Sequence, residues 1–256
     1  MASFHLSKWY LDYVTDDGDV EIAYIGAVGW GPVQLHYSSV LNSAGDRVRQ
    51  RHSLMPQAPP QQKDSVISWR SKALSIDTVW EAVSPAVRET LYRASGGSVA
   101  WNCLMPLART KTQERSGLGY VEHLEMTIPP WQLPIRTLRW GRFTSASDYA
   151  AWIDWEGDFS RRVVYMNGDV IPCSRIDDDR LEAEDGTRLS MDRSLVLRDG
   201  PLGTTALAAV PGIGKMFPLQ LLQIVECKWR SRARLEREDK AAVEGWVIHE
   251  KVSWPR

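Results

Sequence analysis

Apolar residues recur at every second position in the segment 20–28, and no segment of the chain repeats apolar residues every 3.6 positions over several turns. Val20, Ile22, Tyr24, Gly26 and Val28 illustrate the pattern. Because successive side chains of a strand point to opposite faces, a period of two predicts β-strands and argues against long helices. The chain is therefore predicted to be all-β.

Turn-forming residues divide the predicted strands into hairpins. Asp16-Asp17-Gly18-Asp19 is a hairpin turn before the alternating segment, and residues 42–46 form a second turn. Pro85 interrupts the segment 79–94, which is therefore expected to be two strands rather than a helix. Residues 55–63, rich in Pro and Gln, are predicted to form a loop. The other segments predicted as strands are 33–40, 47–50, 98–113 and 119–128.

Three short patterns occur twice in the same order along the chain. The first matches Trp9-Tyr10-Leu11-Asp12 and Tyr24-Ile25-Gly26 with Trp152-Ile153-Asp154 and Tyr165-Met166-Asn167-Gly168. The second matches Leu74-Ser75-Ile76-Asp77 with Leu189-Ser190-Met191-Asp192. The third matches Gly119-Tyr120-Val121-Glu122-His123 with Gly245-Trp246-Val247-Ile248-His249. Such order indicates a duplicated unit. The Pro-rich stretch 129–134 is the natural boundary, since proline removes ladder donors and favours extended linkers. We predict two related antiparallel β domains, residues 1–130 and 131–256, each long enough for a barrel.

Composition and charge exclude several classes of protein. Lys plus Arg (31) nearly balance Asp plus Glu (32), and no block of five or six like charges occurs, so no nucleic-acid partner is expected. No apolar run approaches the roughly 18 residues of a transmembrane segment, and residues 1–10 lack the pattern of a signal peptide, so a cytoplasmic protein is expected. Cys103, Cys173 and Cys227 are widely spaced and indicate neither disulfides nor zinc. We expect no metal and no other cofactor.

Indoles dominate the aromatic residues, with 12 Trp and 8 Tyr against 4 Phe. Trp and Tyr combine a large apolar face with one polar tip, which suits ligand cavities and interfaces. The excess therefore favours a protein that binds a hydrophobic small molecule.

Several stretches of the sequence resemble one known family. Trp9-Tyr10-Leu11-Asp12-Tyr13 with Asp16-Asp17-Gly18, Gly117-Leu118-Gly119-Tyr120-Val121-Glu122-His123, Leu138-Arg139-Trp140-Gly141-Arg142-Phe143 and Trp152-Ile153-Asp154-Trp155 are similar to segments of the carotenoid 1,2-hydratase (hydroxyneurosporene synthase) and AttH-like proteins. The resemblance implies two tandem lipocalin-like antiparallel β-barrel domains. Fungal decalin-forming Diels-Alderases are similar in fold, so the fold alone does not decide the chemistry.

The same resemblance implies catalytic residues. In the hydratases, the acid that protonates the terminal double bond lies in a Gly-Tyr-x-Asp-His type motif, which places it at Glu122 with Tyr120 beside it. The family's upstream His-x-Trp pair corresponds to Val99-Ala100-Trp101, which keeps the Trp and lacks the His.

Strand alternation puts Glu122 on one face with Tyr120, Leu124 and Met126. If that face lines the barrel interior, loss of solvent favours the protonated carboxyl, which can act as a general acid. Aromatic faces would stabilise a carbocation formed from an alkene by about 0.5–2 kcal/mol each. The residues predicted to bind substrate are Trp101, Tyr120, Leu124, Met126, Trp9 and Tyr24.

Other interpretations of these residues stay open. Glu122 can instead face solvent or pair with an arginine, since carboxylates are rarely buried unless paired. His123 and His249, on the opposite face, are expected to make structural hydrogen bonds. Arg142 is expected to form an ion pair at the surface or between domains, or to meet the polar end of a ligand.

The sequence thus favours an enzyme, a hydratase or cyclase of the lyase or isomerase class. It would act on a hydrophobic isoprenoid- or polyketide-like substrate by acid-assisted alkene hydration or cyclisation in a barrel cavity. The alternatives are a non-catalytic carrier of a hydrophobic small molecule and a pericyclase of the Diels-Alderase kind. The expected partner is the small-molecule substrate, and a homodimer is left open.

Overall fold

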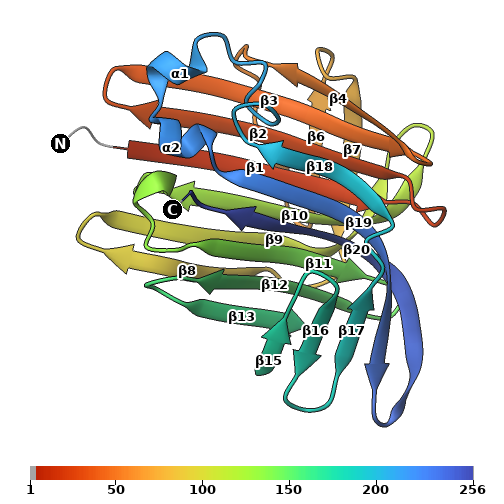
Figure 1. The fold of residues 1–256 in the computed structure, drawn as a ribbon. Coiled ribbons are helices and arrows are strands. Elements are labelled where there is room, and N and C mark those ends of the chain that lie inside the picture. Colours follow the sequence, from red (N-terminus) through yellow and green to blue (C-terminus); the bar gives the residue numbers. More distant parts are fainter. Residues whose placement is uncertain (1–3, 256) are drawn as a thin grey trace. The chain divides into compact units, whose positions relative to one another are not determined.

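The computed structural model describes residues 4–255 and divides into two compact units, of which the first ends at Gln132 and the second begins at Leu133. Each unit is built on one antiparallel sheet that curls into a half-barrel (Figure 1). The predicted fold class, all-β with two tandem antiparallel β-barrel domains, is confirmed, with each barrel present as a curled sheet that forms a half-barrel.

The first unit contains ten strands within its described residues. They are β1 (Phe4–Val14), β2 (Val20–Trp30), β3 (Val33–Ala44), β4 (Arg47–Ser53), β5 (Gln61–Lys63), β6 (Val66–Ser71), β7 (Ile76–Ala82), β8 (Val87–Ala94), β9 (Gly97–Lys111) and β10 (Ser116–Met126). Their order across the sheet is β4-β3-β2-β1-β10-β9-β7-β6-β5. Strand β9 is long enough to pair with β8 along its first half and with β7 near its end.

The second unit repeats this arrangement within its described residues. Its strands are β11 (Thr137–Thr144), β12 (Tyr149–Glu156), β13 (Arg161–Met166), β14 (Asp169–Val170), β15 (Cys173–Ile176), β16 (Arg180–Ala183), β17 (Arg188–Met191), β18 (Leu195–Pro201), β19 (Val225–Arg237) and β20 (Lys240–Ser253). The order is β14-β13-β12-β11-β20-β19-β17-β16-β15, with β18 paired to β19. Each strand of β1–β10 therefore has a counterpart in β11–β20.

The curl of the first sheet encloses one of its faces. Leu11, Val40 and Ile67 belong to a single buried cluster although they come from strands far apart in the sheet order. The fully buried indole of Trp80 lies in the same cluster and donates from Nε1 to the main-chain oxygen of Asp12 at 2.9 Å. Large aromatic side chains bury about 150–250 Å² each, so this packing contributes much of the unit's stability. The enclosed face is filled by side chains.

The second sheet encloses its core in the same way. Phe143, Trp152 and Leu235 belong to one buried cluster with residues of β13, β16 and β17. Strand β12 is buried at every position except its last residue, Glu156. A strand buried on both faces loses the apolar–polar alternation that predicts which side is the core.

Only the third of the repeated sequence patterns lies at equivalent positions in register. His123 pairs with Trp9 on β1, and His249 pairs with Gly141 on the counterpart strand β11. The second match would make Leu189 equivalent to Leu74. It is wrong, because the ladder position of Leu189 in β17 is that of Trp80 in β7.

The first match, between Trp9 and Trp152, is also wrong as a residue equivalence, but it has a physical cause. Trp9 on β1 pairs with Ile25 on β2, whereas Gly141 on β11 pairs with Trp152 on β12. Both indoles are on the core face of their sheets. The same position of the ladder therefore carries one indole in each unit. In the first unit the indole comes from the first strand of the pair, β1, and in the second unit it comes from the second strand, β12.

The hairpins were predicted correctly, and two local predictions were not. Strands β1 to β4 pair in sequence around the predicted turns, and residues 79–94 form parts of two strands. The expected loop 55–63 contains β5. The Pro-rich stretch is not fully extended, since residues 130–132 form a 3-10 turn closed by a 2.9 Å bond from the Gln132 N–H to the Pro129 oxygen. Pro130 begins the turn, where a missing N–H has no cost.

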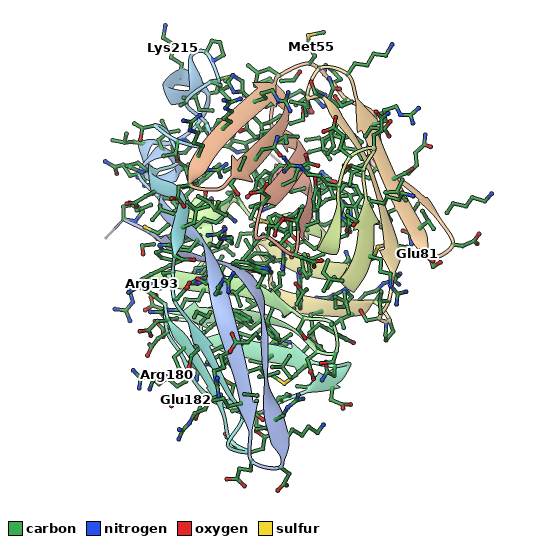
Figure 2. The ribbon with its side chains drawn as sticks, turned by 90° about the vertical axis from the view of Figure 1, so that its right-hand side faces the viewer. Met55, Glu81, Arg180, Glu182, Arg193 and Lys215 are labelled. Atoms are coloured by element: carbon green, nitrogen blue, oxygen red, sulfur yellow. The ribbon has the colours of Figure 1, made fainter. Side chains whose placement is uncertain are left out.

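A long connection distinguishes the second unit. Residues 202–224 join β18 to β19 and carry the four-residue helices α1 (Ile213–Met216) and α2 (Leu219–Leu222), with Lys215 projecting outward (Figure 2). Among residues 4–255, no helix combines the length and apolarity that crossing a membrane requires.

We predict that Gly141→Ala destabilises the second unit. A Cβ at position 141 would overlap the ring of Trp152, which is 1% exposed and has no room to move. Overpacking of this kind costs about 1–3 kcal/mol. The measurement is the free energy of unfolding from urea titrations followed by Trp fluorescence. Gly26→Ala is the control, because its Cβ would meet no atom closer than 3.5 Å. Equal stability of the two variants would contradict the steric explanation.

Candidate functional site

Two paired strands each carry a tyrosine followed two residues later by a carboxylic acid. Strand β1 has Tyr10 and Asp12, and β10 has Tyr120 and Glu122. Their ladder puts Tyr10 opposite Glu122 and Asp12 opposite Tyr120. Residues opposite each other in a ladder share a face, so all four side chains project from one side of the sheet. Each is at most 5% exposed.

Hydrogen bonds hold both acids. Trp101 Nε1 donates to Glu122 Oε2 at 2.6 Å, and the Tyr120 hydroxyl donates to the same oxygen at 2.7 Å. The Tyr10 hydroxyl donates to Asp12 Oδ2 at 2.7 Å. Each acid therefore accepts a hydrogen bond from the tyrosine two residues before it. We call Tyr10, Asp12, Trp101, Tyr120 and Glu122 the acid cluster.

A β-bulge in β9 lets Trp101 reach this face. Val121 pairs with Met105, but the next residue, Glu122, pairs with Cys103, so that Leu104 is extra. The inserted residue leaves Met105 in the core and turns Cys103 and Trp101 toward the acid cluster.

The hydroxyl and thiol beside Glu122 stay protonated at neutral pH. Burial, with added repulsion from Cys103 and Glu122, raises the pKa of Tyr120 well above its ordinary value. Burial likewise raises the pKa of the Cys103 thiol. Tyr120 is therefore a hydrogen-bond donor to the acid and not a phenolate.

Aromatic rings surround the two acids. The ring of Tyr10 lies edge-on to Tyr24 at 5.3 Å and to Tyr120 at 6.0 Å between centroids. Such edge-to-face pairs contribute about 0.5–1.5 kcal/mol beyond their buried area. Three phenol rings and the Trp101 indole thus project from the same face as the acids.

The residues predicted to bind substrate do not all share this face. Tyr24, Trp101, Tyr120, half-buried Leu124 and buried Met126 do. Trp9 does not, because neighbouring positions of β1 alternate; its ring stacks on His123 at 4.7 Å and lines a separate cavity of about 240 Å³.

The enclosed face of the first half-barrel is the one opposite Glu122. Leu11 and Val121, the chain neighbours of Tyr10 and Glu122, belong to the core cluster inside the curl. Glu122 therefore does not face the interior of the half-barrel, which was the condition for its predicted role as a general acid in a barrel cavity. The sequence could not decide this, since both faces of β1 and β10 carry buried residues around the acid cluster.

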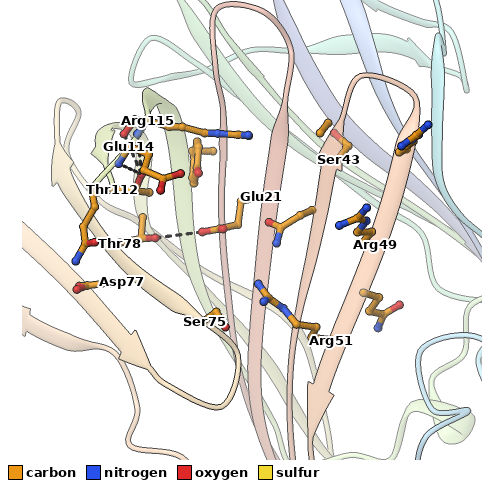
Figure 3. Close-up of a pocket in the computed structure, with 16 residues that line it drawn as sticks. Glu21, Ser43, Arg49, Arg51, Ser75, Asp77, Thr78, Thr112, Glu114 and Arg115 are labelled. Carbon is orange, nitrogen blue, oxygen red and sulfur yellow. Dashed lines mark hydrogen bonds between the residues drawn. The ribbon is translucent and has the colours of Figure 1, made fainter.

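A larger cavity opens on the enclosed face near the β1–β2 and β9–β10 turns (Figure 3). Its volume is about 1070 Å³, and Tyr13, Glu21, Arg49, Arg51 and Thr78 are among its lining residues. None of the acid cluster lines it. Its walls are mainly polar and charged, unlike the apolar walls expected of a site for a hydrophobic substrate.

The structural role predicted for the two histidines is confirmed. His123 Nε2 lies 2.8 Å from Ser7 Oγ, and His249 Nε2 lies 2.8 Å from Ser231 Oγ. The serines come from different neighbouring strands, β1 and β19. Burial lowers the pKa of both imidazoles, and that of His249 falls to about 3.

The second unit carries different chemistry at the positions of the acid cluster. Arg142 stands at the position of Tyr10, and Ile248 at that of Glu122. Arg142 is fully buried and donates to Thr144 Oγ1 at 2.9 Å, so the expectation of a surface ion pair is wrong. Lys228, at the position of Trp101, is also buried, and its Nζ lies 5.4 Å from the ring of Trp140.

Sequence reasoning missed Tyr10 and Asp12 as site residues. Their Tyr-x-acid spacing is the same as that of Tyr120 and Glu122, which was the available signal. What the spacing could not show is that two segments 110 positions apart pair in the register that brings both acids to one face. Within residues 4–255, no three His, Cys, Asp or Glu side chains are grouped to hold a metal ion.

Neither a protein-family model nor a curated protein matches the sequence. Solved structures do match the fold. CghA with Sch210972 aligns over 98% of this chain and 88% of its own, with a TM-score of 0.57 and 10% identity. A kievitone hydratase from Nectria haematococca aligns over 96% and 88%, with a TM-score of 0.53 and 13% identity. A putative AttH from Nitrosomonas europaea aligns over 96% and 92%, with a TM-score of 0.53 and 10% identity.

The fold is two-domain and lipocalin-like. This confirms the architecture implied by the sequence resemblance, which the chain shares with the putative AttH and with the kievitone hydratase. At 10–13% identity the match establishes the fold alone.

We predict that protonation of His249 destabilises the fold at acidic pH. The imidazole has a pKa of about 3 in the fold against 6.5 when solvated, so the unfolded chain takes up a proton that the native chain excludes. The free energy of unfolding should therefore fall as pH drops from 6.5 toward 3, by about 1 kcal/mol per pH unit.

Comparison with His249→Asn isolates this contribution. The variant lacks the imidazole, so its stability deficit relative to the natural chain should shrink as the pH falls. Urea unfolding at a series of pH values measures the deficit. His52→Asn, at an exposed position on β4, is the control for the loss of an imidazole. A deficit for His249→Asn that does not change with pH would contradict the prediction.

Proposed function

We propose that the protein is an enzyme that transforms a hydrophobic, isoprenoid- or polyketide-like small molecule by acid-assisted alkene hydration or cyclisation. The observation that carries the proposal is the buried Glu122, held by Trp101 and Tyr120 through one oxygen. Among proteins of the same fold, one is a kievitone hydratase and another, CghA, binds the small molecule Sch210972.

Glu122 would be the acid of the reaction. In its protonated form it delivers a proton to the alkene, which becomes a carbocation while Glu122 becomes a carboxylate. The Trp101 and Tyr120 hydrogen bonds then stabilise that carboxylate, since bonds to an ionised acceptor are about twice as strong as neutral ones. These two donors are already in place before the proton moves.

Capture of the cation completes the reaction. Water attacks the carbocation and loses a proton to Glu122, which restores the acid and leaves an alcohol. If a nucleophilic double bond of the same molecule attacks instead, the product is a ring and a later proton loss restores Glu122. The faces of Tyr10, Tyr24 and Trp101 can stabilise the cation by about 0.5–2 kcal/mol each.

We predict that Glu122→Gln abolishes turnover and keeps the fold. Glutamine preserves the shape and accepts the hydrogen bonds of Trp101 and Tyr120, but it cannot donate a proton in this way. Loss of a general acid lowers rates by about 10²–10⁴-fold. The measurement is product formation, by mass spectrometry, from a panel of acyclic isoprenoids and linear polyenes. Far-UV circular dichroism and urea unfolding report the fold.

Glu125→Gln is the matched control, because Glu125 lies on the same strand and is exposed on the other face. It should turn over substrate at the natural rate. A product heavier by one water indicates hydration, and an isomer of the substrate indicates cyclisation. Full activity of Glu122→Gln would overturn the acid assignment. Saturable binding with the ligand always recovered unchanged would instead identify a carrier.

A further inference from the structure

Strand β4 carries three arginines at alternate positions, Arg47, Arg49 and Arg51. Alternate residues of a strand share a face. Arg51 pairs with Val40 of β3, which belongs to the enclosed core of the first unit. The three guanidinium groups therefore project on the enclosed side of the sheet, where they line one wall of the 1070 Å³ cavity. Figure 3 shows Arg49 and Arg51 on this wall.

The guanidinium groups of Arg47, Arg49 and Arg51 make no hydrogen bond and no ion pair with other residues among 4–255. The charge of Arg51 nevertheless acts on Glu21, whose pKa it tends to lower. Two of the other charges near the cavity are paired, Arg115 with Asp19 at 3.1 Å and Asp77 with Arg70 at 3.0 Å, and Glu114 also lines the cavity. The wall formed by β4 is thus a row of positive charge without an ion pair among residues 4–255.

The floor of the cavity carries a carboxyl group and a hydroxyl group. Glu21 lies there, half-buried, and accepts a hydrogen bond from Thr78 Oγ1 at 3.1 Å. Burial raises the pKa of Glu21 above its ordinary value, and the charges of Arg51 and Arg115 act against this shift. Tyr13, nearly fully buried, adds a hydroxyl that burial keeps protonated.

Spacing determines what such a row can bind. Successive arginines at alternate strand positions are separated by about 7 Å along the strand, so one small group cannot engage all three. Each guanidinium offers a planar pair of donors that matches phosphate or carboxylate. We propose that this cavity binds a small-molecule polyanion with two or more phosphate or carboxylate groups. The site is on the opposite face of the sheet from the acid cluster and does not depend on its chemistry.

A structural alternative makes a different prediction. β4 is at one end of the strand order, and charged residues on terminal strands prevent pairing with another chain. If the arginines served only that purpose, their removal would cause self-association, and the natural chain would not bind polyanions.

The test is titration calorimetry with inorganic pyrophosphate, citrate and acetate, on the full chain at low salt. We expect saturable binding of pyrophosphate or citrate and none of acetate. Tighter binding of pyrophosphate assigns the site to phosphoryl ligands, and tighter binding of citrate assigns it to polycarboxylates; both support the proposal. Raising the salt should weaken binding, because exposed charges are screened over about 10 Å at 0.1 M.

Two triple variants that each remove three positive charges distinguish binding at this cavity from nonspecific attraction of anions to the protein's charge. Arg47→Gln/Arg49→Gln/Arg51→Gln should weaken polyanion binding at least about tenfold, which corresponds to about 1.4 kcal/mol. Lys63→Gln/Arg88→Gln/Arg93→Gln changes three exposed basic residues of the same unit outside the cavity, and should bind within about twofold of the natural chain. Glu122→Gln should bind polyanions like the natural chain, whatever its turnover.

Three results would overturn the proposal. The first is no binding of pyrophosphate or citrate at millimolar concentration. The second is equal weakening in both triple variants. The third is self-association of the β4 variant together with no binding by the natural chain. Size-exclusion chromatography of both variants reports the oligomeric state.

Discussion

The ladder between β1 and β10 is the contact on which the first unit depends. It joins the first strand of the unit to its last, over 110 positions of sequence, and so links the two halves of the sheet. The same register decides the chemistry of both faces. It brings Tyr10 opposite Glu122 on one side and Leu11 opposite Val121 in the core on the other. A slip of one residue would exchange these faces, so core packing fixes the position of the acids.

Much of the local structure could be predicted from the sequence because it depends on neighbouring residues. The turns at residues 16–19 and 42–46 predicted the two hairpins. Pro85 predicted correctly that residues 79–94 do not form a helix. Alternation also predicted that Tyr120 and Glu122 share a face. It could not predict which face the curl encloses, because β12 and the last five residues of β1 are buried on both sides. Nor could it find Asp12, whose relation to Glu122 arises only from long-range pairing.

The two units show how one topology supports different buried chemistry. In the first, the face opposite the core carries Asp12 and Glu122, each bonded to a tyrosine. In the second, the equivalent face carries buried Arg142 and Lys228. Charged groups are costly to bury unless hydrogen bonds or opposite charges compensate them. In the second unit, Glu226 and Glu250 pair with Lys228. The buried charges therefore differ between the units, whereas the core positions Val121 and Val247 are the same in both.

The position of the core indole has a consequence for how such units can diverge. Trp9 faces Ile25 in one unit, and Gly141 faces Trp152 in the other. Transferring β11 alone into the first unit would leave a void beside Ile25, and transferring β1 alone into the second would force two indoles into the volume of one. The smallest interchangeable part of this fold is therefore a pair of adjacent strands. At this ladder position the two units share the presence of one indole across the strand pair, which a comparison of single equivalent residues does not reveal.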